Sequence, residues 1–509
     1  MKRTDLAVVL VVASSAACMG SADDAIDCSD GRCDAKKVKE IRAADEAGFL
    51  RYLSQARVWA DPNIAALTPD DILDGPAFSG AFPFEDHVEC TFNAEETAEQ
   101  NGATPKFACD IGKDTFKVKY GNAEVNSEAI VTRLFFALGF AADGDYSVRV
   151  TCNGCPADIQ ATLAETGGMA LIERKFPAIE IIPDGTQRTI EGWRMAEYRD
   201  FAGVGRSDLE QSVAQLEALQ LLQAFVQHGD CKPEQQRLVC EESGVTLAGA
   251  NIDDKKVAND TAELAHCTAP VALIQDLGST LGDGKLLTSK LALQEWAAVP
   301  VFKSGTGVCR ADLGLNATCA LAGGVADPVI SESGRRFLVE RIDAMTDAQL
   351  LAIFQAGRVD EIAFDGGTGQ QWVAAFRAKV EQMRARTCTE RPLLIDAVPG
   401  GGFARTPDGK LSLTTTLAAF DADGVDGEVK YVLKQAGKTD IVLRAPLAAA
   451  SATRLDRAQT IVIDDEADAC VRGHVGPHVL EISIVDADGT ESRAVRSQVN
   501  LTTVPGPGC

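Results

Sequence analysis

The sequence has no long hydrophobic run: no apolar stretch in its 509 residues approaches the ~20 residues that a membrane-spanning helix needs. Basic residues are also scarce, since 49 Lys and Arg stand against 74 Asp and Glu, and the net charge is −25. A chain of this charge repels a phosphate backbone, so we expect no nucleic-acid partner. Low-complexity sequence is missing as well and 46% of the residues are hydrophobic, which excludes a disordered, collagen-like or coiled-coil chain.

Several catalytic signatures are absent too. The sequence contains no Gly-x-Ser-x-Gly, no His-Glu-x-x-His and no Walker phosphate loop. Its length favours two or three folded domains over one.

The N-terminal residues 1–17 have the composition of an export signal, with Lys2 and Arg3 before a short apolar stretch. Residues 15–17, directly before Cys18, resemble a bacterial lipobox, although Ser15 stands where Leu is usual. Ordinary signal peptidase could also cut there. We expect an exported protein of the bacterial cell envelope that is tethered to a lipid membrane through Cys18.

Cysteine usage supports export. Of 15 cysteines, 14 remain when Cys18 is set aside, an even number that is compatible with full pairing in an oxidising compartment. Their connectivity cannot be deduced from the sequence. Cys152 and Cys155 have the spacing of a redox motif, but without a βαβ context we expect a structural disulfide. Zinc is the alternative, and no second CxxC at ribbon spacing supports it.

Changes in the pattern of apolar and polar residues along the chain divide it into segments. We expect a tether and a helical lead-in over residues 18–75, and a β-rich segment over 76–205. A mainly helical segment is expected over 206–390 and an all-β sandwich over 391–509. The fold class is therefore α+β.

Local patterns place individual elements. A helix is expected over 124–138, and capping boxes at Ser207 and Thr346 predict two more helix starts. Strands are expected where residues alternate or run apolar: 116–120, 146–150, 170–173, 178–182, 271–274, 411–414, 429–433, 460–463 and 479–484.

One eight-residue stretch carries the sharpest signal. Residues 228–235 read His-Gly-Asp-Cys-Lys-Pro-Glu-Gln, identical at five of eight positions to the protein-kinase catalytic loop His-Arg-Asp-Leu-Lys-Pro-Glu-Asn. An apolar strand then ends in Asp276-Leu277-Gly278, close to the Asp-Phe-Gly of kinases. Upstream, Lys119 lies on an expected strand, and Glu124 and Glu128 lie one turn apart on the helix that follows it. Either could pair with Lys119, and we choose Glu128 because it sits inside the helix rather than at its frayed start.

In this order the motifs resemble those of the atypical protein-kinase-like superfamily, akin to secretory-pathway and spore-coat kinases, over roughly residues 80–385. The resemblance implies a two-lobed kinase-like domain, with residues 76–205 as the N-lobe and 206–390 as the C-lobe. The last segment resembles immunoglobulin-like domains of bacterial surface proteins.

The resemblance also implies roles. Asp230 would be the catalytic base and Lys232 would neutralise charge on the transferred group. Lys119 and Glu128 would position ATP. Asp276, with Gln235, would hold Mg²⁺. The acceptor is an unknown protein or small molecule.

The sequence departs from the kinase pattern in several places. Gln235 stands where Asn is usual, and no Gly-x-Gly-x-x-Gly precedes Lys119. Residues 109–113 are the only loop expected there, so the sequence does not account for a phosphate lid. A polar insertion over 241–266 separates the two motifs, and we expect Cys240 and Cys267 to pin it.

Other interpretations stay open. A strand Lys is usually solvated, and an imidazolium at position 228 could cap a helix C-terminus. The rival function is a catalytically inactive kinase-like envelope lipoprotein that acts as a binding or scaffold module. Nucleotidyl transfer is the alternative within catalysis.

Overall fold

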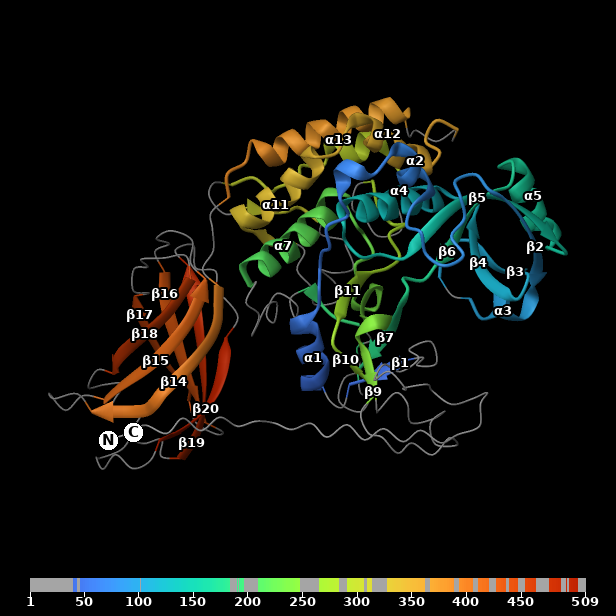
Figure 1. Ribbon diagram of the computed structural model, residues 1–509. Coiled ribbons are helices and arrows are strands. Elements are labelled where there is room, and N and C mark those ends of the chain that lie inside the picture. The colour runs from blue at the N-terminus through green and yellow to red at the C-terminus, as the bar shows by residue number, and fades with distance from the viewer. Residues whose placement is uncertain are drawn as a thin grey trace, which may run out of the picture.

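The computed structural model describes residues 40–43, 46–100, 102–183, 190, 192–195, 209–247, 265–282, 291–305, 309–313, 327–361, 367–388, 393–405, 411–420, 427–435, 439–446, 454–463, 476–486, 491 and 494–501. These residues combine helices with several sheets (Figure 1), so the expected mixed α+β class is confirmed. In this part of the chain, no helix has both the length and the apolar character to cross a membrane.

A closed barrel forms the β-rich part of residues 76–183. Its strand order is β2-β3-β4-β6-β5, and β2 and β5 close it by pairing in parallel while the other pairs are antiparallel. The predicted strands 116–120, 146–150 and 170–173 lie within it. The barrel strands are β2 (His87–Asn93), β3 (Lys106–Ile111), β4 (Asp114–Tyr120), β5 (Gly144–Asn153) and β6 (Met169–Arg174).

Helix α4 (Ala123–Leu138) covers one face of the barrel, and it confirms the predicted helix over 124–138. The side chain of Asn122 accepts from the backbone N–H groups of the first turn, and Gly139 ends the helix at φ 85°. Val125 and Ala129 pack on Leu171 of β6. Other short helices nearby are α2 (Pro69–Asp74), α3 (Ala94–Ala98) and α5 (Ala157–Glu165).

A four-stranded sheet in the order β1-β7-β8-β11 joins segments that lie far apart in the sequence. Its strands are β1 (Glu40–Arg42), β7 (Ala178–Ile182), β8 (Gln236–Glu241) and β11 (Pro270–Ile274). The lead-in is therefore not only helical, since β1 precedes α1 (Glu46–Gln55). Ile41 pairs with Ile181 and both are buried, so tertiary pairing overrides local helix preference.

The segment 206–390 holds long helices around an aromatic core, but short strands also run through it, so it is less helical than expected. Thr346 begins its helix with the predicted capping box, whereas Ser207 lies outside the described residues. The helices are α7 (Leu209–Phe225), α9 (Leu293–Ala298), α11 (Glu332–Asp343), α12 (Asp347–Ala356) and α13 (Gly369–Arg384). The additional strands are β9 (Val245–Leu247), β10 (Ala265–Cys267), β12 (Cys309–Arg310) and β13 (Val329–Ile330).

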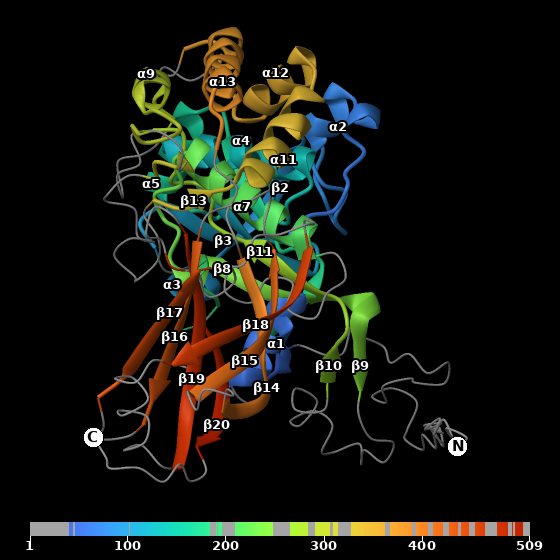
Figure 2. The same cartoon turned by 90° about the vertical axis from the view of Figure 1, so that its left-hand side faces the viewer.

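Residues 393–501 form two antiparallel sheets, β14-β15-β18 and β17-β16-β19-β20, which stand as a separate β unit in both views (Figures 1 and 2). The Thr415 hydroxyl and the Tyr431 hydroxyl are 2.9 Å apart and link the two inner faces. All predicted strands of this segment are present. They are β14 (Leu393–Arg405), β15 (Leu411–Phe420), β16 (Gly427–Lys434), β17 (Ile441–Pro446), β18 (Arg454–Ile463), β19 (Gly476–Asp486) and β20 (Val495–Leu501).

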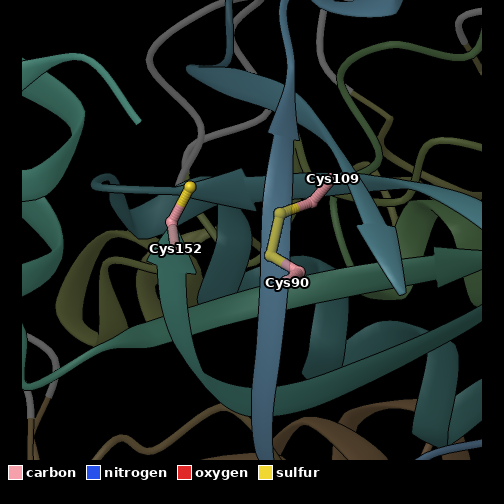
Figure 3. A group of neighbouring side chains, drawn as sticks. All are labelled: Cys90, Cys109 and Cys152. Atoms are coloured by element: carbon pink, nitrogen blue, oxygen red, sulfur yellow. A yellow bond between two sulfur atoms is a disulfide. The ribbon is translucent and has the colours of Figure 1, made fainter. Parts of the chain in front are cut away.

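Disulfides fasten the described part of the chain, as the cysteine count predicted. Cys152 bonds Cys155, so the CxxC pair is a bridge, and Cys240 bonds Cys267 across the insertion as expected. The sulfur atoms of Cys90, Cys109 and Cys152 lie close together on neighbouring barrel strands (Figure 3), but all three belong to disulfides and leave no thiolate for zinc. Cys90 bonds Cys109, and Cys309 bonds Cys388. Such bridges are consistent with an exported protein.

Candidate functional site

Lys119 and Glu128 meet because strand β4 turns directly into helix α4. Gly121 makes the turn at φ 77°, a left-handed conformation that favours glycine. Lys119 Nζ then donates to Glu128 Oε1 over 2.5 Å, and both side chains are almost fully buried. Glu124, the other candidate partner, instead lies against Gly278.

Asp276 reaches this pair from the other end of the sequence. Strands β8 and β11 are antiparallel with Gln236 opposite Ile274, so the residues before β8 lie beside the residues after β11. Asp276 has φ 52°, a left-handed conformation that is rare for a residue with a Cβ. One of its carboxylate oxygens lies 4.0 Å from Lys119 Nζ, and the other accepts from Gln235 Nε2 at 2.9 Å.

The loop over 228–235 is held against the turn that follows β11 and contains Asp276. His228 is fully buried, and its Nε2 donates to the Asp276 carbonyl over 3.2 Å, since a carbonyl oxygen only accepts. Burial lowers the pKa of His228, which favours the neutral ring over the imidazolium cap considered from the sequence. Lys232 Nζ donates to Asp230 over 2.8 Å.

The segment Asp276-Leu277-Gly278 is also docked on helix α4. Ser127 Oγ donates to the Gly278 carbonyl, and Leu277 is buried in the main core. A Cβ at position 278 would come within 2.5 Å of the Glu124 side chain, so only glycine fits without movement there. The position of α4 and the position of Asp276 are therefore coupled.

Two acidic residues that the sequence did not single out complete the surroundings of Lys119. Glu173 of β6 lies 3.2 Å from Lys119 Nζ, and Asp145 of β5 stands directly opposite Glu173 in the register. Burial alone would lower the pKa of Lys119, but Glu128, Glu173, Asp145 and Asp276 outweigh it and hold that pKa well above its usual range. Lys119 therefore keeps its positive charge, and four carboxylates surround its ammonium group.

Only a weak sequence signal pointed to these two residues. Asp145 follows Asp143 and Gly144, a composition typical of a turn, and Glu173 sits at the end of an ordinary alternating strand. A charged residue on a strand that is buried on both faces is the one available clue. The sequence alone does not show that these strands are buried on both faces, because that burial depends on helix α4 covering the outer face of the barrel.

Some predicted features lie elsewhere. The loop expected over 109–113 is shorter than that, because 109–111 belong to strand β3 and only 112–113 form the turn into β4. Cys231, inside the candidate loop, is disulfide-bonded and only 1% exposed. Cys18 lies outside the described residues.

Comparison with known proteins gives no family assignment: no family model matches the sequence, and no curated protein matches it. Function therefore has to be argued from the geometry of the residues themselves.

Proposed function

We propose that this protein binds a magnesium–nucleotide complex and transfers phosphate from ATP to an unknown protein or small-molecule acceptor. The observation that carries the proposal is the approach of Asp276 to the buried Lys119–Glu128 pair, within 4.0 Å of the Lys119 ammonium. Protein kinases use the same three groups: a strand Lys for the phosphates, a helix Glu that orients it, and an Asp on the metal.

The order of elements supports the proposal. Lys119 lies on the third barrel strand, β4, and Glu128 lies on the helix that follows this strand directly. The protein-kinase arrangement has its Lys on the third strand and its Glu on the next helix. A two-lobed kinase-like fold with a C-terminal immunoglobulin-like domain is part of this proposal.

The donor set fits a hard cation. Asp276 offers carboxylate oxygens and Gln235 an amide, and Mg²⁺ prefers oxygen ligands of this kind. The Asp276 side chain is 36% exposed, so a ligand can reach it. Bound Mg²⁺ would supply charge neutralisation for the phosphates, and Asp276 with Gln235 would hold it.

The remaining roles fall to charged groups of the chain. Lys119 would bind phosphate oxygens, with Glu128 keeping its ammonium in place. Asp230 would accept the proton from the acceptor hydroxyl. Lys232, 2.8 Å from Asp230, would face the developing charge on the transferred group.

The cover over the phosphates differs from that of ordinary kinases, which use a glycine-rich loop. Here the connection between β2 and β3 carries helix α3. Thr97 of that helix accepts from the Ala108 backbone N–H, which ties α3 to β3. A nucleotide would therefore meet a helical segment at this end of the barrel.

A catalytically inactive binding or scaffold module is the second candidate. The disulfide at Cys231 favours it, because a covalent tether inside the loop restricts the adjustment that transfer requires. We also propose export to the cell envelope, which the disulfides support. A lipid anchor at Cys18 is part of this proposal and rests on the sequence before that residue alone.

Thermal-shift titration with Mg²⁺ and ATP tests the enzyme proposal. We expect a metal-dependent shift in the wild type and in Glu234→Ala, a matched loop variant that loses an exposed acid, and no shift in Asp276→Ala. If the wild type shows no shift, the enzyme proposal is wrong and the binding module remains.

Radiolabelled ATP then tests the chemistry. Asp230→Ala should keep the thermal shift but lose release or transfer of the γ-phosphate by ~10²–10⁴-fold, the usual contribution of a general base. If transfer persists, Asp230 is not the base. Label transferred from the α-position instead would identify nucleotidyl transfer.

A further inference from the structure

A cluster of three carboxylates lies beside Lys119, contributed by helix α4 and by barrel strands β5 and β6. One carboxylate oxygen from each of Glu128, Asp145 and Glu173 lies within 4.8 Å of the others. Glu128 and Asp145 are each 1% exposed, and each keeps one buried oxygen without a hydrogen-bond partner. Unpaired buried carboxylate oxygens are costly, so their presence indicates a ligand.

The charges in the cluster are unevenly matched. Glu173 contacts the ammonium groups of Lys117, Lys119 and Lys175. Asp145, in contrast, makes no ion pair with any residue that the structure describes.

We propose that Glu128, Asp145 and Glu173 hold one divalent cation of the hard, oxygen-binding class, such as Mn²⁺, Mg²⁺ or Ca²⁺. Cation–oxygen distances of about 2.1–2.5 Å place ligands of one ion up to about 4–5 Å apart, which matches the observed spacing. All three ligands are carboxylates, which selects hard cations over zinc or copper. The cluster shares Glu128 with the proposed nucleotide site, but neither Asp276 nor Gln235 belongs to it.

A cavity adjoins the Glu173 edge of this cluster. It has a volume of about 510 Å³ and is lined by Lys117, Glu173 and Lys175, among others. The Lys175 side chain is 64% exposed, so the cavity reaches the surface beside the Glu173 edge of the cluster. The inference requires neither nucleotide binding nor phosphate transfer, so it stands apart from the proposed function.

Mn²⁺ titration of the nucleotide-free full chain, followed by electron paramagnetic resonance, tests the proposal. After treatment with chelator, the wild type should bind one Mn²⁺ that Asp145→Asn binds about tenfold more weakly or not at all. Asp143→Asn is the matched control, because Asp143 is a buried carboxylate two residues away that pairs with Lys175 and is not in the cluster. That control should bind Mn²⁺ like the wild type.

Asp276→Asn separates the two sites. Retention of the Mn²⁺ ion in this variant supports the cluster, whereas its loss there with retention in Asp145→Asn places the ion at Asp276 and overturns the proposal. Equal binding by the wild type and Asp145→Asn also overturns it, since the buried oxygens would then share a proton. Thermal unfolding of each variant, with and without Mn²⁺, shows whether the chain is folded, and only the cluster variants should lose metal-dependent stabilisation.

Discussion

Two lysines are buried in different regions of this molecule, and their surroundings are opposite. Lys119, in the barrel, is 4% exposed and faces four carboxylates, which hold its pKa well above the usual range. Lys379, in helix α13, is 1% exposed and donates to the carbonyls of Trp296 and Val299 at the end of α9. Burial there lowers the pKa of Lys379 to about 7.

The difference shows that the two lysines have different roles: Lys379 caps the end of a helix, whereas Lys119 lies within a cluster of carboxylates. Lys379 satisfies carbonyls that the end of a helix leaves without partners, and it packs against the aromatic ring of Trp296. Lys119 is surrounded by acids from two barrel strands, β5 and β6, from α4 and from the turn after β11. Burial of a lysine alone therefore says nothing about function, whereas an excess of carboxylates around it indicates a site.

Replacement of Lys119 should have the largest effect on stability. Lys119→Met leaves Glu128 and Glu173 buried with less compensation, and loss of one partner of a buried ion pair costs about 3–5 kcal/mol. Denaturant unfolding measures this cost, and the Mg²⁺–ATP thermal shift should disappear. A loss below about 1 kcal/mol would mean that the cluster is already neutralised by protons.

The second largest effect should be on the pH dependence of stability, which we expect to differ between the Lys119 cluster and Lys379. In the presence of chelator, Asp145 is protonated in the folded chain up to about pH 7 but ionises near pH 4 when unfolded. The unfolded chain then binds fewer protons, so this residue makes stability fall as pH rises from about 4 to about 7. Asp145→Asn should lack that fall, and denaturant unfolding at several pH values measures it. An unchanged slope in the variant would contradict the assignment.

Lys379→Met should have a smaller effect with the opposite trend. The wild-type Lys379 loses its proton near pH 7 when folded but only near pH 10.5 when unfolded, so its contribution to stability grows between these values. The variant leaves two carbonyls without a donor, which costs about 1–3 kcal/mol. This cost should be largest at alkaline pH, while the Mg²⁺–ATP thermal shift stays as in the wild type. Loss of that shift would make Lys379 more than a cap.

The smallest effect is expected at Glu124. Glu124→Gln keeps the shape that packs on Gly278 and removes only a favourable charge in the first turn of α4, worth about 0.3–1 kcal/mol. Glu128→Gln, one turn later, removes the partner of Lys119 and should abolish phosphate transfer. If both variants lose transfer equally, the choice of Glu128 over Glu124 is not supported.

Local chemistry accounts for the parts of the site that the sequence could predict. Lys119 and Glu128 are nine positions apart across a strand, a turn and a helix, so their contact follows from local geometry. The predicted capping box at Thr346 is present because one helical turn is enough to form it. The contact of Asp276 with Gln235 was anticipated only through the resemblance to kinases, since 41 positions separate them.

Pairing between distant strands accounts for what the sequence could not predict. Asp145 and Glu173 are neighbours only because β5 and β6 pair in one register, and a shift by one residue would turn one of them away. Strand β1 formed in a segment expected to be helical because β7 offered it a partner. The pairing of Cys309 with Cys388 rather than with a nearer cysteine has the same origin.

The sequence by itself determined the α+β class, the helix over 124–138, the start of α12 and nine of the described strands, because these depend on residues within a few turns of one another. The Lys119–Glu128 pair was expected through the resemblance to kinases. Only the tertiary structure decided that Asp145 and Glu173 also surround Lys119 and that Cys309 bonds Cys388. Those contacts depend on strand register and chain crossing, where the free energy comes from burial and pairing of residues that local propensity does not connect.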